Sequence, residues 1–209
     1  MSSIKNIIFD LGGVLYAIDY QKIESGMASL QLETADSVKY SRSYQDPLFT
    51  QLEIGSITPE AFWEGMKSRF QLRDDCEAFF KVWNSMLHGL ISGRQNLVQE
   101  LTQNYRVFLL SNTNIIHYQF LITECEPMFQ LMEHCYFSHE VGMRKPDPQI
   151  FTHILQAHHL LPQETLFIED SEQHIVAAKA LGIQTIFVQS DAWPDQLQNL
   201  LSTSSINAS

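Results

Sequence analysis

The sequence predicts a Rossmann-like, doubly wound α/β domain whose parallel sheet is interrupted by a helical insertion after its first strand. Two observations support this fold class. Short apolar runs without clean alternation recur along the chain, as in strands buried on both faces of a parallel sheet, and helical patterns of crossover length separate the later runs. The chain has 209 residues, 44% hydrophobic and 18% charged, which is enough for one such domain carrying a smaller insertion.

Five apolar runs are expected to form the sheet. In chain order they cover residues 5–10 (KNIIFD), 106–111 (RVFLLS), 134–138 (HCYFS), 165–170 (TLFIED) and 184–189 (QTIFVQ). Helices are expected over 148–160 and 171–182, the second of which closes on Gly182 as a C-cap. These elements alternate strand and helix, as a doubly wound domain requires.

The region between the first and second of these runs has a different pattern. Residues 17–92 contain amphipathic helical segments and no strand of the buried kind; one helix should begin at Thr58 as N-cap with Pro59 at its first position. We therefore expect an α-helical cap domain at 17–92 and an α/β core domain made of 1–16 and 93–209. An aromatic stripe in the cap is expected to form its own core: Phe62, Trp63, Met66, Phe70, Phe79, Phe80 and Trp83.

Polar residues stand where the predicted strands end. Asp10, Ser111 and the pair Glu169 and Asp170 close three of the runs, and Lys145 lies in the loop between the third and fourth. In open parallel sheets the ligand crevice lies at this edge. Three close carboxylates raise one another's pKa unless a cation lies among them, and a hard divalent ion such as Mg²⁺ takes oxygen ligands. A hydroxyl, an ammonium and a nucleophilic aspartate are what phosphoryl transfer through an aspartyl phosphate needs.

Composition argues against several other classes of function. The formal net charge is −11, with 24 acidic and 13 basic residues, so the chain would repel a nucleic-acid backbone. No apolar stretch is long enough to span a bilayer and no cleavable leader is evident, so we expect a cytoplasmic protein without membrane contact. Three cysteines without C-x-x-C spacing suggest neither a disulfide framework nor a zinc site. The expected partner is a small-molecule phosphate ester, bound by a monomer or weak homodimer.

Four motifs in fixed order carry a family resemblance. FDLGGVL, LLSNTN, VGMRKPDPQIF and FIEDS resemble the haloacid dehalogenase-like (HAD) superfamily, and the likeness covers essentially the whole chain, including a helical cap directly after the first motif. The finer match is similar to the bacterial sugar-phosphate phosphatases of this superfamily that act on glucose 1-phosphate. The resemblance implies a Mg²⁺-dependent phosphatase with an aspartate nucleophile, acting on a small phosphorylated metabolite such as a sugar phosphate.

The resemblance also implies a role for each motif residue. Asp10 would be the nucleophile and a metal ligand, and Lys145 would tie the phosphate to it. Ser111 and the backbone of Asn112 would cradle the phosphate. The remaining metal-site residues would be Asp170 as a direct or water-mediated ligand, Glu169 as a ligand or an orienter of bound water, and the carbonyl of Gly12.

Gly12 departs from the family pattern. Most phosphatases of the superfamily carry a second aspartate there, which protonates the leaving alcohol and later activates water. A general acid/base contributes about 10²- to 10⁴-fold in rate, so its loss predicts a slower or more selective phosphatase that favours good leaving groups, such as the anomeric oxygen of a sugar 1-phosphate. Asp19 is a candidate replacement; alternatively, Asp19 is simply the N-cap of a helix over 20–30.

Two other functions stay open on the sequence alone. A 2-haloacid dehalogenase of the same fold also lacks an aspartate at position 12, but it works without metal and does not gather acidic residues at the positions of Glu169 and Asp170. A non-catalytic relative that binds a ligand or partner is supported by Gly12 alone. Near the motifs, we expect Arg144 and His174 to lie at the surface. Asn114 and His117 either line the pocket or begin a polar helix.

Overall fold

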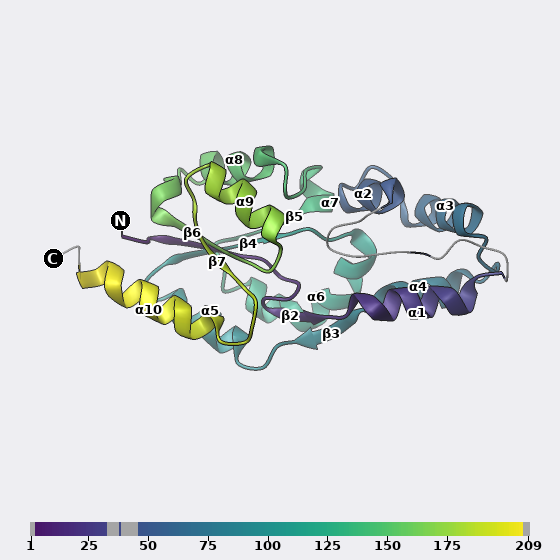
Figure 1. Ribbon diagram of the computed structural model, residues 1–209, viewed down its shortest axis with the longest axis horizontal. Coiled ribbons are helices and arrows are strands. Elements are labelled where there is room, and N and C mark those ends of the chain that lie inside the picture. The colour runs from purple at the N-terminus through teal and green to yellow at the C-terminus, as the bar shows by residue number, and fades with distance from the viewer. Residues whose placement is uncertain (1–2, 33–37, 39–45, 207–209) are drawn as a thin grey trace.

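A five-stranded parallel sheet forms the centre of the molecule (Figure 1). The computed structural model describes residues 3–32, 38 and 46–206. The strands, in their order across the sheet, are β5 (His134–Phe137), β4 (Arg106–Ser111), β1 (Asn6–Phe9), β6 (Thr165–Glu169) and β7 (Gln184–Phe187). Each strand lies within one of the five predicted runs, and the predicted fold class is confirmed.

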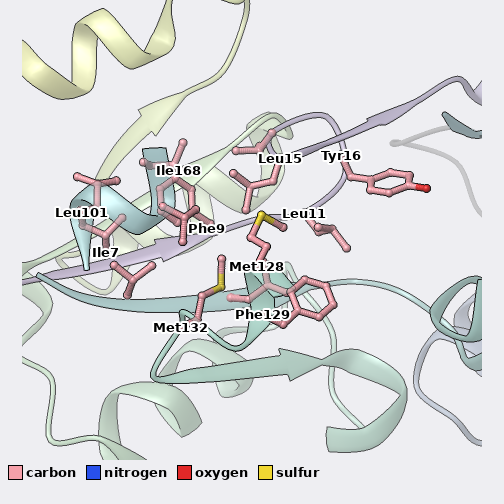
Figure 2. Packing of buried hydrophobic residues seen from close by; sticks show 14 of the residues in the cluster. Ile7, Phe9, Leu11, Leu15, Tyr16, Leu101, Met128, Phe129, Met132 and Ile168 are labelled. Carbon is pink, nitrogen blue, oxygen red and sulfur yellow. The ribbon is translucent and has the colours of Figure 1, made fainter. Parts of the chain in front are cut away.

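Helices cover both faces of the sheet, which explains why the strands read as continuous apolar runs (Figure 1). On β1, Ile7 and Phe9 pack into one layer and Ile8 into the other. Figure 2 shows Ile7 and Phe9 in the first layer, in one cluster with Met128, Phe129 and Met132. The first layer is closed by α5 (Arg94–Leu101), α6 (Ile115–Phe129) and α10 (Trp193–Ile206), the second by α8 (Pro148–Ala157) and α9 (Glu172–Ala180).

Helix ends follow the expected capping chemistry. After α9, Gly182 adopts a φ of 82° and its N–H donates to the carbonyl of Lys179 at 3.0 Å, as predicted for a C-cap. Helix α8 ends at Ala157, three residues before the predicted end. Two short elements complete the core: α7 (Ser138–Val141) and the 3₁₀ turn η1 (Pro162–Glu164).

The insertion after β1 is mainly helical and extends beyond the carboxyl ends of the strands (Figure 1). Its helices are α1 (Tyr20–Leu30), α2 (Pro47–Glu53), α3 (Pro59–Phe70) and α4 (Cys76–Asn84). Thr58 caps α3 by accepting from the N–H of Ala61 at 3.2 Å. The predicted aromatic stripe is buried in a separate apolar cluster, except for the partly buried Phe80. On this basis we propose residues 17–92 as a cap domain.

A short antiparallel pair joins the insertion to the core and was not predicted. Strand β2 (Tyr16–Ile18) pairs with β3 (Leu87–Leu90). One carboxylate of α6, that of Glu124, accepts from the Tyr16 hydroxyl at 3.1 Å and from the Leu90 N–H at 2.9 Å. The strand that enters the insertion and the strand that leaves it are thereby both fixed to α6. Within the described ranges, none of the helices combines the length and the apolar character needed to cross a membrane.

Candidate active site

Lys145 occupies the centre of the polar cluster at the carboxyl edge of the sheet. Its ammonium donates to Asp10 Oδ1 at 2.8 Å, to Glu169 Oε2 at 2.7 Å and to the carbonyl of Leu110 at 2.9 Å. The side chain is fully buried. Burial opposes its charge, but the two carboxylates outweigh that effect and raise the pKa of Lys145 above its ordinary value. Lys145 is thus a fully hydrogen-bonded cation held between two acids.

Three buried carboxylates meet beside this lysine because β1 and β6 are adjacent parallel strands. Asp10 follows β1, Glu169 ends β6 and Asp170 comes next; one oxygen of each lies within 4.8 Å of the others. Burial, and then the charge of Glu169, raise the pKa of Asp10 well above its ordinary value. One ammonium does not balance three carboxylates. A hard divalent cation with oxygen ligands therefore fits this donor set.

Glu169 is engaged on both of its oxygens. Oε1 accepts from the backbone N–H groups of Asp170 and Ser171, each at 3.0 Å, and Oε2 accepts from Lys145. The ring of His174 also lies against it, with Nδ1 at 3.0 Å from Oε2. Burial alone would raise the pKa of Glu169, but Lys145 and His174 hold it well below its usual range. This carboxylate is the ionised anchor of the cluster.

The residues predicted to bind phosphate lie at the end of β4. Ser111 is its last residue and is buried. The side chain of the next residue, Asn112, has a role that the sequence did not suggest: its Oδ1 accepts from the Lys145 N–H at 2.9 Å and its Nδ2 donates to the Lys145 carbonyl at 2.8 Å. The loop that carries Lys145 is therefore fastened to the end of the neighbouring strand.

One pocket contains nearly all of the predicted site residues. Its lining includes Asp10, Gly12, Ser111, Asn112, Lys145, Glu169 and Asp170. Among the described residues, Asp19 is the predicted site residue that does not line it. Its carboxylate accepts from the N–H of Gln21 at 2.9 Å and caps α1, which begins at Tyr20. Of the two alternatives for Asp19, the structure matches the N-cap of the helix.

The missing side chain at position 12 leaves an apolar surface. A Cβ at Gly12 would lie 3.1 Å from Cδ1 of Ile18, the last residue of β2. The tight turn itself depends on Gly13, which has a φ of 76° and donates to the carbonyl of Tyr16 at 2.8 Å. At the position where most family phosphatases carry an acid, this chain therefore presents a glycine backed by isoleucine.

The haloacid dehalogenase-like hydrolase family model matches residues 4–182. The chain belongs to this family. It is 32% identical over 216 residues to the D-ribitol-5-phosphate phosphatase of Bacteroides thetaiotaomicron, with 96% of this chain and the whole of that protein covered. A glyceraldehyde 3-phosphate phosphatase of Pyrococcus furiosus is 25% identical, with 90% of this chain and 81% of that protein covered.

Solved structures of HAD enzymes share the fold. A HAD family enzyme of Bacteroides thetaiotaomicron, in complex with magnesium and inorganic phosphate, has a TM-score of 0.78 at 31% identity, with 90% of this chain and 96% of that one covered. A HAD-like family hydrolase of Porphyromonas gingivalis has a TM-score of 0.80 at 25% identity, covering 95% and 98%. A dehalogenase at 17% identity and a TM-score of 0.62 shows the shared fold alone.

Arg144 of this HAD hydrolase lies in the pocket lining and not at the surface, contrary to the prediction from sequence. Its Nε lies 3.0 Å from Oε2 of Glu53 in α2, and its Nη1 donates to Thr50 Oγ1 at 3.1 Å. The Arg144 side chain is 19% exposed and that of Glu53 is 5% exposed. The sequence carries no local signal of this contact, because both partners belong to the insertion.

Two histidines of the HAD hydrolase near the motifs are buried, and for His174 this differs from the prediction. His174, expected at the surface, is 8% exposed and lies against Glu169. His117 lines the pocket together with Asn114, which also caps α6. His117 Nε2 donates to the carbonyl of Trp83 in the insertion at 3.0 Å, so its Nδ1 accepts from Asn114 Nδ2 at 3.1 Å. Burial lowers the pKa of His117 to about 4.

Proposed function

We propose that this hydrolase is a Mg²⁺-dependent phosphatase of small polyhydroxylated phosphate esters, such as sugar or sugar-alcohol phosphates. The observation that carries the proposal is the buried cluster in which Lys145 bridges Asp10 and Glu169 beside Asp170. The similarity to a D-ribitol-5-phosphate phosphatase supports the substrate class, and that to a HAD enzyme solved with magnesium and inorganic phosphate supports the cofactor.

The metal would be held at the carboxyl ends of β1 and β6. Asp10, Asp170 and the backbone carbonyl of Gly12 are the proposed ligands. Glu169 already accepts from protein donors on both oxygens, so we assign it the task of holding Lys145 and the loop after β6. When bound, a divalent cation offsets the negative charge of the phosphoryl oxygens and of the carboxylates.

The chain's own residues then account for a two-step transfer. The Asp10 carboxylate attacks phosphorus, an oxygen–phosphorus bond forms to Asp10, and the bond to the leaving alcohol breaks. Lys145 offsets the charge at the attacking carboxylate and on the phosphoryl oxygens, while the Ser111 hydroxyl and the Asn112 backbone N–H donate to those oxygens. Water then hydrolyses the aspartyl phosphate, which releases phosphate and restores Asp10.

Gly12 makes the leaving group decisive in this proposal. Without a carboxyl there, the departing oxygen takes its proton from water, so the first step is faster for esters whose alcohol leaves readily. A sugar 1-phosphate meets that condition, whereas a terminal sugar-alcohol phosphate, the substrate named for the Bacteroides relative, has a primary alkoxide as its leaving group. The two substrate types are therefore to be compared directly.

The first test measures hydrolysis of p-nitrophenyl phosphate by the wild type with Mg²⁺, by the wild type with EDTA, and by the variant Asp10→Asn. The second measures kcat/KM of the wild type for ribitol 5-phosphate, glucose 1-phosphate and glucose 6-phosphate. We expect turnover that EDTA and Asp10→Asn both abolish. Folded protein that hydrolyses none of these esters would instead support the non-catalytic alternative. Metal-independent release of halide from a 2-haloacid would support the dehalogenase alternative.

A further inference from the structure

Arg144 and Glu53 form an ion pair in the wall of the pocket, between the loop before Lys145 and helix α2 of the insertion. We propose that this pair makes Arg144 a specificity-determining residue, which restricts the phosphatase to esters whose leaving group carries no second negative charge. The proposal rests on the proposed phosphatase function. It deepens that function by excluding bisphosphates and phosphorylated sugar acids from the preferred substrates.

The pocket supplies little positive charge. Among the described residues that line the pocket, the lysine and arginine side chains are those of Lys145 and Arg144. Lys145 has three acceptors for its three ammonium hydrogens, and two of them are carboxylates of the reaction centre. Of the described cations, Arg144 is therefore the one left to meet a carboxylate or second phosphate on the substrate.

The histidines of the lining do not change this conclusion. His117 uses Nε2 to donate to the Trp83 carbonyl and Nδ1 to accept from Asn114, so both of its ring nitrogens are engaged. His174 has its Nδ1 against the carboxylate of Glu169. Neither ring is placed to neutralise an anion at the insertion side of the pocket.

The positive charge of Arg144 is already compensated by the carboxylate of Glu53. Its Nε lies 3.0 Å from Glu53 Oε2, and its Nη1 is held by Thr50. An added anion beside Arg144 would face the negative charge of Glu53 in a partly buried site, where repulsion is weakly screened. Hydroxyl groups meet no such penalty, because the pair offers them guanidinium donors next to carboxylate acceptors.

The rest of the insertion side of the pocket fits the same substrate class. Ile18, Tyr20, Met86 and Leu87 line it, which is a mainly apolar surface interrupted by Glu53. A carbon chain bearing hydroxyls can pack its C–H groups there while its hydroxyls reach the ion pair. A strongly hydrated anionic group would lose its water against such a surface, and the described cation nearby, Arg144, is already paired with Glu53.

The test uses two linear six-carbon substrates that differ only at the end remote from the phosphate, sorbitol 6-phosphate and 6-phosphogluconate. For the wild-type enzyme we expect kcat/KM to favour the uncharged polyol. Glu53→Gln keeps the size of the side chain and removes its charge, so the ratio should shift about tenfold towards the sugar acid, as about 1.4 kcal/mol of charge interaction requires. Arg144→Gln should shift the ratio in the opposite direction.

Opposite shifts separate a charge effect from general damage to the pocket, and the double variant Glu53→Gln/Arg144→Gln should return towards the wild-type ratio. Glu133→Gln, which breaks the surface ion pair with Arg106, is the matched control and should leave the ratio unchanged. Unchanged ratios, or shifts of the two single variants in the same direction, would overturn the inference. If the wild-type enzyme hydrolyses no phosphate monoester at all, the proposed function fails, and the inference fails with it. Each single variant tests the proposal independently if the other does not fold.

Discussion

The side chain of Asn112 holds the main chain of Lys145 by two reciprocal hydrogen bonds: Oδ1 accepts from the Lys145 N–H at 2.9 Å, and Nδ2 donates to the Lys145 carbonyl at 2.8 Å. The end of β4 and the loop that carries the ammonium are thus one unit. An ammonium on a four-carbon stem reaches its two carboxylates only if its backbone stays in place. Asn112 is therefore a positioning residue for the charge next to Asp10, the proposed nucleophile.

Asn112→Asp should lower kcat for the phosphatase reaction. Aspartate retains an oxygen for the Lys145 N–H but loses the donor to the Lys145 carbonyl, and it adds a negative charge beside the site. A small displacement of a catalytic group costs up to about 10²-fold in rate, so we expect a fall of that order in kcat with a smaller change in KM. The exposed Asn104→Asp is the control. A variant with unaltered kcat would show that Lys145 does not depend on this contact.

Adding Mg²⁺ should raise the thermal stability of the protein, because three buried carboxylates share one ammonium without it. A ligand present at 100 times its dissociation constant stabilises the folded state by about 2.7 kcal/mol. Thermal unfolding should therefore shift upward with Mg²⁺ concentration, and Asp170→Asn should weaken the response. Asp191→Asn, at a fully exposed carboxylate, should respond as the wild type does. Equal shifts in both variants would argue against a metal at this cluster.

His117 should make folding stability depend on pH. Burial lowers its pKa from 6.5 to about 4, so between these values the unfolded chain binds a proton that the folded protein does not. The neutral His117 ring contributes about 3 kcal/mol to the free energy of unfolding. This contribution is present in full above pH 6.5 and is lost as the pH falls towards 4. Denaturant unfolding at pH 7 and pH 5 should show a smaller fall in stability for His117→Gln than for the wild type. An identical fall in both would contradict the assignment.

Gly12→Asp should restore a general acid and accelerate poor leaving groups most, by a factor within the usual range of about 10² to 10⁴. The new Cβ would lie 3.1 Å from the end of the Ile18 side chain, which must yield by a few tenths of an ångström; Ile18→Val in the same protein relieves that contact. Gly12→Asn has the same shape and transfers no proton at neutral pH. If it matched Gly12→Asp in rate on glucose 6-phosphate, the gain would not come from acid catalysis.

Asp19→Ala should cost stability and leave turnover at saturating substrate unaltered. The carboxylate caps α1 through the Gln21 N–H, and loss of such a cap costs about 1 kcal/mol. Asp19→Ser keeps a capping oxygen without a carboxylate and should restore most of the stability. A large fall in kcat in both variants would revive Asp19 as the missing acid/base.

The sheet was predictable because its strands are buried on both faces, so that most of their residues are apolar. Asp10, Ser111 and Asp170 lie at one edge of the sheet because they stand at the ends of adjacent parallel strands. The pair β2 and β3 was missed because each strand is short and is stabilised by Glu124 on a distant helix. The exposure of Arg144 was predicted wrongly for a related reason: it is set by α2, which lies far away in the sequence.

The antiparallel pair at the base of the insertion has a consequence for how this chain could be re-engineered. The chain leaves and returns side by side, and the pairing is extended by the Asp19 N–H on the Met86 carbonyl and the Ile91 N–H on the Leu15 carbonyl, both at 2.9 Å. In topology the insertion is therefore one very long hairpin loop. A segment of different length or sequence could be exchanged between Asp19 and Met86 without altering the strand order beneath it. We expect such a graft to change the preferred substrate while leaving Asp10 and Lys145 in place, and chimeras cut at these two residues would test this.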